Sequence, residues 1–218
     1  MSSTQVDHLV VAATSLEQGV AWCEITLGIV PGPGGKHPLM GTHNRVFSIA
    51  STAYPATYFE IIAIDPEAPP PQRRRWFGLD DPELQERIAL SPRLVHVVAR
   101  SRMLDRHRRD LAAVGIDLGL PIAMSRDTPN GRLAWQVLVR DDGGLQLGGA
   151  LPTLIEWDGT HPTDHMAASG VTLRELRLGG LPTLVRQVLA LQGVTHVPES
   201  GLRAALSTPL GDVILESE

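Results

Sequence analysis

The sequence predicts an α+β fold built from two copies of one structural unit and a shorter third copy. The first copy has the order strand, helix, glycine-rich loop, strand and strand, and the chain repeats this order from residue 93 onwards. His8 lies 20 residues before Gly28, where the first helix is expected to end, and His96 lies 19 residues before Gly115. Because internal similarity at a fixed period indicates duplicated structure, the two histidines are expected at equivalent strand positions.

The first copy is expected to span residues 1–66. Residues 7–13 are apolar and β-branched, as in a buried strand, and residues 15–28 have apolar side chains at helical spacing. A serine that can cap the start of this helix and a glycine that can end it flank the segment. Residues 44–51 and 57–64 are predicted as two strands joined by a turn.

The second copy is expected to span residues 93–168. Residues 93–101 repeat the first strand, and residues 103–116 repeat the helix and its closing glycine. Residues 133–140 and 151–158 are predicted as the paired strands of this copy.

Two further segments complete the expected organisation. Residues 67–92, rich in Pro and Arg, are predicted as a linker with a short helix at 81–90, and residues 117–133 are predicted to be loop-like. Residues 169–218 form the third copy, a C-terminal βαββ extension that begins with a strand and contains a helix over 181–193. This copy has no histidine at the matching position, so it is interpreted as a packing or dimer element.

Composition limits the class of protein. The chain has 218 residues, 43% hydrophobic content, a net charge of -5 and one cysteine. No apolar run approaches the ~20 residues that cross a bilayer, and the arginines form no basic face, so no membrane or nucleic-acid partner is expected. The first residues lack a basic, apolar leader, which favours a cytoplasmic protein. No GxGxxG, GxxxxGK[ST], GxSxG, CxxC or HExxH motif supports hydride transfer, nucleotide hydrolysis or serine hydrolysis.

Four polar residues stand on strands that are otherwise apolar. His8 and His96 lie on the first strand of each copy, and Glu60 and Glu156 lie on a late strand of each copy. Two imidazoles and two carboxylates on one concave sheet would give a divalent metal four ligands, a mixed set that suits Fe(II), Mn, Co, Ni or Zn. In the alternative interpretation the histidines are hydrogen-bonded core residues and the glutamates lie on the surface.

The glycine-rich segment GGKHPLMGTHN at residues 34–44 is longer than a plain connection needs. Its glycines permit a close approach of the backbone to a ligand, and His37, His43 and Asn44 supply hydrogen-bonding groups. A wall of the cleft is therefore the predicted role. The alternative is a glycine-rich surface loop.

Two more loops carry groups that suit a site. SRDTPNGR at 125–132 is expected as a turn whose Arg126 faces an anionic substrate, or as a plain turn. WDGTHPTDH at 157–165 is interpreted either as the mouth of the cleft or as a solvated loop, and Pro162 argues against a regular helix there. The ligand-type residues of this second loop are Asp158, His161, Asp164 and His165.

The segments DHLVVAATSLEQGVAW, GGKHPLMGTHN, YFEIIAIDP and LPTLIEWDGTHP together resemble a glyoxalase-like domain of the vicinal oxygen chelate superfamily. The resemblance covers most of the chain and implies paired βαβββ modules that form an open barrel-like cleft. It also implies that a metal is held by a first-strand histidine and a fourth-strand glutamate of each module. Carried over by position, these ligands are His8, Glu60, His96 and Glu156.

The leading functional hypothesis is a metal-dependent enzyme acting on a small, oxygen-rich substrate that chelates the metal. Lyase or isomerase chemistry is favoured over dioxygenase chemistry, and Glu156 and His43 are the candidates for proton transfer. The alternative is a non-catalytic small-molecule binding protein in which Trp22, Trp135 and Trp157 matter more than the carboxylates. The paired modules and an exposed edge strand are compatible with a homodimer. The expected substrate contacts are His37, Asn44, Arg126 and Trp157.

Overall fold

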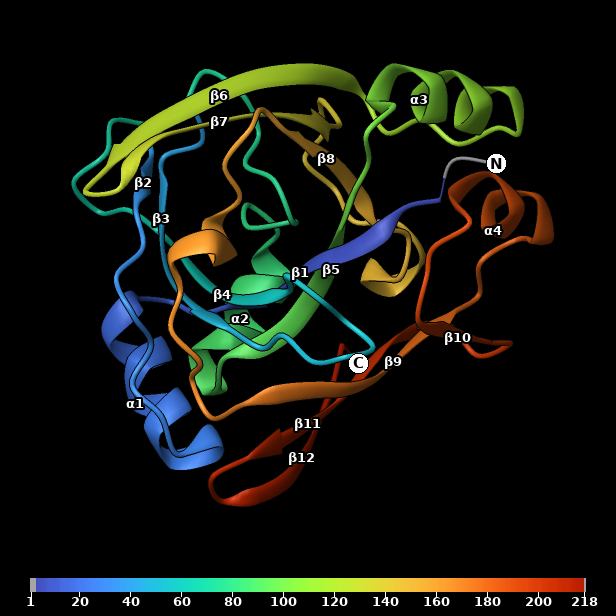
Figure 1. The fold of residues 1–218 in the computed structure, drawn as a ribbon. Coiled ribbons are helices and arrows are strands. Elements are labelled where there is room, and N and C mark those ends of the chain that lie inside the picture. Colours follow the sequence, from blue (N-terminus) through green and yellow to red (C-terminus); the bar gives the residue numbers. More distant parts are fainter. Residues whose placement is uncertain (1–2, 218) are drawn as a thin grey trace.

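Residues 3–217, which the computed structural model describes, contain two β-sheets and a few short helices (Figure 1). The larger sheet has eight strands. They are β1 (Gln5–Ala12), β2 (Lys36–His37), β3 (Thr42–Ser48), β4 (Tyr58–Ile64), β5 (Arg93–Arg100), β6 (Leu120–Thr128), β7 (Gly131–Val139) and β8 (Thr153–Trp157).

The strand order of this sheet, β2-β3-β4-β1-β5-β8-β7-β6, reveals the duplication. β1 pairs in parallel with β4, and β5 pairs in parallel with β8, so both modules are built alike. Antiparallel pairing of β1 with β5 joins the two halves. The sheet curls around its concave face (Figure 1), and the predicted α+β class with paired modules is confirmed.

The smaller sheet contains the C-terminal extension. Its strands β9 (Thr172–Gly179), β10 (Val194–Val197), β11 (Gly201–Thr208) and β12 (Gly211–Glu216) follow the order β10-β9-β11-β12. The intervening helix α4 (Thr183–Leu189) is shorter than predicted, because the backbone adopts a left-handed conformation at Ala190. The extra strand β10 follows directly after the segment predicted as this helix, in a stretch for which no element was expected.

The first helix begins and ends at the capping residues that the sequence indicates. In α1 (Leu16–Leu27), the Ser15 side chain accepts a hydrogen bond from the backbone at the helix start, and Gly28 ends the helix with a positive φ. The remaining helices are α2 (Pro82–Leu90), α3 (Leu104–Ala113) and the 3-10 turns η1 (Leu147–Gly149) and η2 (Pro162–His165). In the described part of the chain, no helix combines the length and apolarity that a membrane crossing requires.

Two hydrophobic cores lie on opposite faces of the large sheet. Leu9, Phe59 and Leu154 face the outer core, which is shared with α1, α3, α4 and the smaller sheet. Val10 and Ile155 face the inner core on the concave side. The segment predicted as a linker closes this concave side, because its aromatic residues and α2 pack into the inner core.

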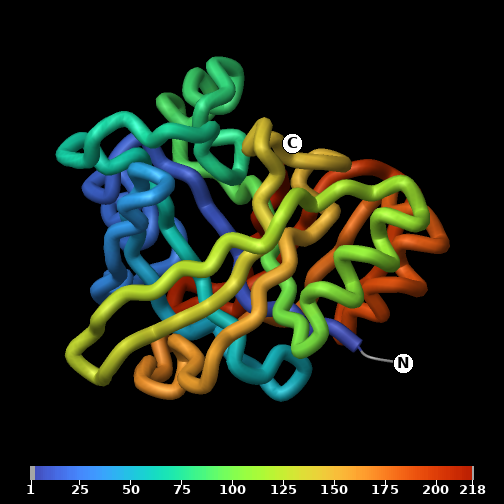
Figure 2. Tube along the Cα trace, turned by 90° about the horizontal axis from the view of Figure 1, so that it is seen from above, coloured from blue at the N-terminus to red at the C-terminus, as the bar shows by residue number. Residues whose placement is uncertain are grey.

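Residues 117–133, expected to be loop-like, contain most of an antiparallel hairpin instead. β6 and β7 pair along their whole length, from Leu120 opposite Val139 to Thr128 opposite Gly131. In Figure 2 this hairpin is the long yellow-green arm of the chain. β6 is an edge strand with a proline and partly exposed side chains, so it lacks the buried pattern that identifies a central strand.

Candidate functional site

A small cavity lies on the concave side of the large sheet. Its volume is about 30 Å³, which is room for a water-sized group, so a larger ligand has to displace side chains of the wall. The side chains of its lining that carry polar groups, besides the indoles, are His8, His37, Tyr58, Glu60 and Arg126. Its indole walls are Trp76, Trp135 and Trp157.

His8 and Glu60 face one another at the wall of this cavity. They come from the neighbouring parallel strands β1 and β4, and His8 Nε2 lies 3.5 Å from Glu60 Oε2. Asn44 on β3 donates from Nδ2 to Glu60 Oε1 at 2.5 Å and accepts at Oδ1 from the backbone N–H of Gly35 at 2.7 Å. The glutamate is therefore held at one oxygen, and its other oxygen faces the imidazole.

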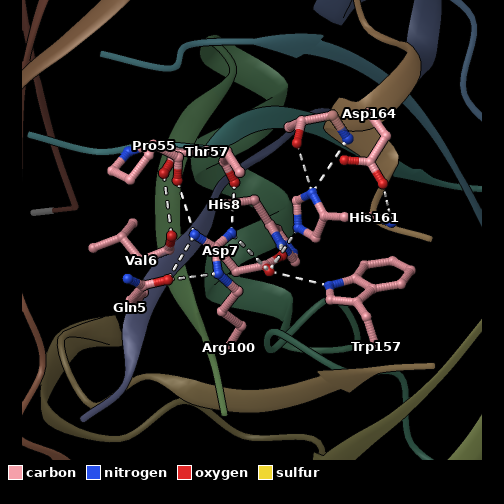
Figure 3. A network of polar contacts seen from close by, with 12 residues as sticks. Gln5, Val6, Asp7, His8, Pro55, Thr57, Arg100, Trp157, His161 and Asp164 are labelled. Atoms are coloured by element: carbon pink, nitrogen blue, oxygen red, sulfur yellow. Dashed lines mark hydrogen bonds and ion pairs between the residues drawn. The ribbon is translucent and has the colours of Figure 1, made fainter. Parts of the chain in front are cut away.

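Asp7 is the carboxylate on the far side of His8 (Figure 3). The pairing of β1 with β5 shifts register between Val6 and His8, and such a bulge lets successive side chains leave the usual alternation. Asp7 is fully buried, and its Oδ1 lies 2.7 Å from His8 Nδ1. Its Oδ2 accepts from Trp157 Nε1 at 3.0 Å and from His161 Nε2 at 3.0 Å.

The charge of Asp7 fixes the proton positions of its partners. Burial alone raises the pKa of this carboxyl, but the hydrogen bonds from His161 and His8 outweigh burial and hold the pKa well below its usual value. An ionised carboxylate only accepts, so His8 donates to it from Nδ1, and Nε2 is the ring nitrogen that faces Glu60. His161 accepts at Nδ1 from the backbone N–H of Thr163, which leaves Nε2–H to donate to Asp7.

His37 is a second imidazole at the cavity. Burial lowers its pKa to about 3, and the nearby positive charge of Arg126 acts in the same direction, so this side chain is neutral at neutral pH. Its Nδ1 lies 3.2 Å from Thr42 Oγ1, and its ring meets the rings of Trp76 and Trp135 edge to face. A neutral imidazole of this kind can donate one N–H to a ligand without adding charge.

The glycines of the segment 34–44 allow it to approach the cavity. A Cβ added to Gly34 would overlap the backbone carbonyl of Asn44, and one added to Gly35 would overlap the guanidinium of Arg126. Only glycine permits this spacing. The structure therefore places the segment against the cavity wall, with His37 and Asn44 on the cavity side.

The histidine of the second module lies on the same face but is bound within the protein. His96 Nε2 accepts from the backbone N–H of Thr153 at 3.1 Å and lies 2.9 Å from its hydroxyl oxygen. His96 Nδ1 lies 3.0 Å from the carbonyl oxygen of Gly149, so both ring nitrogens have partners. Burial lowers the pKa of His96 to about 3.

Glu156 and His43 are not brought together with these residues. Glu156 Oε2 accepts from the backbone N–H of Leu104 at the start of α3, on the outer side of the sheet. His43 lies next to Asn44 on β3 and therefore on the opposite face, where its Nδ1 is 4.0 Å from Asp65 Oδ1. Neither side chain lines the cavity.

The ligand set implied by the resemblance can be tested on these positions. His8 Nε2 and Glu60 Oε2 face the same cavity, and Asp7 gives His8 the outer carboxylate that metal-binding histidines usually have. The lone pair of His96 Nε2 is used by a backbone N–H, and Glu156 points away. Among residues 3–217, no three or more His, Cys, Asp or Glu side chains are grouped as metal ligands. The residues do not fit the expected four-ligand centre.

The sequence did not point to several residues of the site. Asp7 could have been found, because a charged residue at the start of an apolar strand is seldom buried without partners. Trp76 and Phe77 gave no such signal, because they lie in the irregular segment between the two modules, where no strand or helix pattern assigns them a direction. Trp22, expected as a possible ligand contact, instead packs on Phe59 in the outer core.

Comparisons with known proteins agree with this architecture. Residues 6–190 match the glyoxalase-like domain family. A hypothetical protein from Staphylococcus aureus is similar in structure, with a TM-score of 0.59 and 15% identity, over 98% of this chain and 85% of that one. Methylmalonyl-CoA epimerase from Mycobacterium tuberculosis aligns with a TM-score of 0.40 and 14% identity, over 71% of this chain and 87% of that one. A search of curated proteins gave no significant match.

The duplicated modules and the cavity on their shared concave face define a protein of the vicinal oxygen chelate type. The chain belongs to the glyoxalase-like domain family, as its match over residues 6–190 shows. The resemblance seen in the sequence is thereby confirmed.

Proposed function

We propose that this chain is an enzyme that moves a proton at a carbon atom of a small molecule, in an isomerase or lyase reaction. The observation that carries the proposal is the series Asp7, His8 and Glu60 at the wall of a buried aromatic cavity. A buried carboxylate that orients a histidine is a recurrent arrangement for a general base. Glu60, beside His8, is a second group that can hold the transferred proton.

In the proposed mechanism His8 Nε2 takes a proton from a carbon next to a carbonyl group. The electron pair of the broken C–H bond moves to the carbonyl oxygen and gives an enolate. Asp7 compensates the positive charge that the imidazole gains, and Glu60 Oε2, 3.5 Å away, exchanges the proton with His8. Return of the proton to another face or atom gives isomerisation, and departure of a group from the neighbouring carbon gives a lyase reaction.

His37 is the proposed partner of the enolate oxygen. Its lowered pKa, about 3, keeps it neutral, so it stabilises the oxygen by donating a hydrogen bond. In this role Thr42 donates its hydroxyl proton to Nδ1, and Nε2–H faces the ligand. Burial of the site strengthens such an interaction because water does not compete for the oxygen.

Exchange of substrate hydrogen with solvent tests this proposal. The protein is incubated in D₂O with a panel of small 2-oxo acids, their methyl esters and 3-oxo thioesters, and deuterium next to the carbonyl is followed by proton NMR. We expect catalysed exchange for at least one compound, with a loss of roughly 100-fold or more in His8→Gln and in Glu60→Gln.

The matched control for these variants is His43→Gln, which alters a histidine on the opposite face of the same sheet. Its exchange rate should equal that of the wild type. Equal rates in His8→Gln, Glu60→Gln and the wild type would refute proton transfer by this pair. So would the absence of catalysed exchange across the whole panel.

The aromatic walls favour a second candidate, a binding protein without catalysis. The rings of Trp135 and Trp157 pack on each other with centroids 5.2 Å apart, as do those of Trp76 and Phe77, and these aromatic walls would favour contact with an apolar or aromatic ligand. A ligand that quenches tryptophan fluorescence equally in the wild type and in Glu60→Gln, with no exchange in either, would support this candidate. Loss of exchange with binding retained in Glu60→Gln would support the enzyme.

A further inference from the structure

We propose that the cavity takes a small molecule with a flat apolar body and one carboxylate group, and that Arg126 binds this carboxylate. The inference deepens the proposed function, because it names the class of substrate for the same site. It rests on the position and partners of one arginine, and it can be tested separately from catalysis.

Arg126 reaches the cavity from the β6–β7 hairpin. It lines the cavity together with His8, His37 and Glu60, although it lies far from the first module in the sequence. The close approach is possible because Gly35 has no side chain at the point where the guanidinium passes. The hairpin therefore brings a permanent positive charge to a site whose base lies on another module.

The guanidinium of Arg126 has almost no hydrogen-bond partners within the described part of the protein. Its single hydrogen bond in the described residues is a long one, 3.4 Å from Nη1 to Asn44 Oδ1, and its buried Nε has no acceptor. No carboxylate within the described residues forms an ion pair with it. Asn44 itself is occupied, because the same oxygen accepts from the backbone N–H of Gly35 at 2.7 Å.

Two other arginines bind acceptors of the protein through their terminal nitrogens, although the Nε of Arg75 is unpaired like that of Arg126. Arg75 donates to Asp80 at 2.6 Å, and Arg100 donates to the side chain of Gln5 and to backbone carbonyls. Arg126 differs from both, because the five N–H groups of its guanidinium have one protein acceptor, the distant Asn44 Oδ1. Leaving a partly buried charge unpaired is costly, so a ligand that supplies the missing acceptors is favoured.

The other groups that line the cavity limit the class of ligand that fits beside Arg126. Glu60 is engaged by Asn44 and faces His8, so it does not supply the anion that Arg126 lacks. A planar carboxylate matches the two parallel N–H bonds of a guanidinium. The stacked and tilted rings of the walls accept a flat body, and the small cavity favours a compact anion. A carboxylate held by Arg126 would place the adjacent carbon within the same cavity as His8 and Glu60.

A pair of probes of the same shape and different charge tests the inference. Benzoate and benzamide are titrated at a pH at which benzoate is ionised, and binding is followed by tryptophan fluorescence, since three of the four tryptophans line the cavity. We expect wild type to bind benzoate about tenfold or more tightly than benzamide, the ratio that one charge-assisted interaction supplies. In Arg126→Gln the benzoate affinity should fall to that of benzamide, and the benzamide affinity should not change.

The matched control is Arg132→Gln, which removes an arginine of the same hairpin that hydrogen-bonds Ser125 and does not line the cavity. It should keep the preference for benzoate. Equal affinities in the wild type, a preference that persists in Arg126→Gln, or no binding of either probe up to roughly 10 mM would overturn the inference.

The two proposals fail in different experiments. A preference for benzoate that depends on Arg126, without catalysed deuterium exchange, would support the carboxylate site and contradict the proton-transfer function. Exchange that requires His8 and proceeds equally with 2-oxo acids and their methyl esters would do the reverse.

Discussion

Thr153 occupies the position in the second module that Glu60 occupies in the first. Two residues after the first-strand histidine of each module, Val10 lies opposite Glu60 and Val98 lies opposite Thr153 in the parallel strand pairs. The hydroxyl of Thr153 is 2.9 Å from His96 Nε2, so each histidine still faces the residue at this position. The two modules therefore share this geometry, with a carboxylate in the first module and a hydroxyl in the second.

Replacing this threonine should create a metal site. In Thr153→Glu, a second carboxylate would join His8 and Glu60 on the concave side, and one imidazole with two carboxylates forms a suitable ligand set for a divalent metal. We expect near-stoichiometric Zn or Ni in Thr153→Glu and much weaker binding in the wild type, measured by calorimetry and elemental analysis.

The control for the metal experiment is Glu156→Gln, which should leave metal binding by the wild type unchanged. Treatment of the wild type with a chelator should likewise leave catalysed exchange intact. Stoichiometric metal in the wild type that is lost in Glu156→Gln would show that the expected four-ligand set forms after all.

Glu156 is expected to matter for stability and not for chemistry. Its Oε2 accepts a hydrogen bond at the start of α3, where no other side chain caps the helix. Glu156→Ala, which removes the acceptor, should lower the free energy of unfolding by about 1 kcal/mol, measured by urea denaturation, because helix caps contribute on this scale. Catalysed exchange should be unchanged, whereas Glu60→Gln should lose it.

Asp7→Asn should lose both activity and stability. The amide of asparagine can donate, so it no longer fixes the His8 proton on Nδ1, and the base loses its stabilising charge. We expect exchange to fall about 100-fold or more, and the free energy of unfolding to fall by about 3 kcal/mol, since the buried donors of His8, Trp157 and His161 lose their charged acceptor. The control Asp158→Asn, on an exposed neighbour of Trp157, should change neither quantity.

Stability should fall as the pH is lowered from about 6.5. Burial lowers the pKa of His37 and of His96 to about 3, so the unfolded chain binds more protons than the folded one between this value and the ordinary value of 6.5. The free energy of unfolding therefore rises with pH across this window, by up to about 1.4 kcal/mol per pH unit for each histidine. Urea denaturation at several pH values measures this slope.

Variants show how much of this pH dependence comes from a single histidine. His96→Gln should reduce the slope by up to about 1.4 kcal/mol per pH unit, because one histidine with a lowered pKa is removed. His165→Gln, at an exposed position, should keep the full slope. A wild-type stability that does not change between pH 5 and pH 7 would contradict the buried, neutral state of both imidazoles.

The duplicated fold and the first histidine could be predicted from the sequence because they depend on local patterns. Helix caps such as Ser15 and the spacing of apolar residues were sufficient for these elements. The position of Glu156 could not be predicted, because the register of β8 against β5 makes Thr153 the counterpart of Glu60. Alternation along a strand also fails at a bulge, which is why Asp7 and His8 share one side.

The carboxylate of Asp7 belongs to the first module, yet Trp157 and His161, which both donate to its Oδ2, come from the second module and the loop that follows it. A symmetric ancestor with two equal modules would have had two equal half-sites. Here the first half provides Asp7, His8 and Glu60, and the second half provides the hydrogen-bond donors to Asp7, two of the three indole walls and the guanidinium of Arg126. The two modules therefore contribute different residues to one site, and two copies of either module alone would lack part of it.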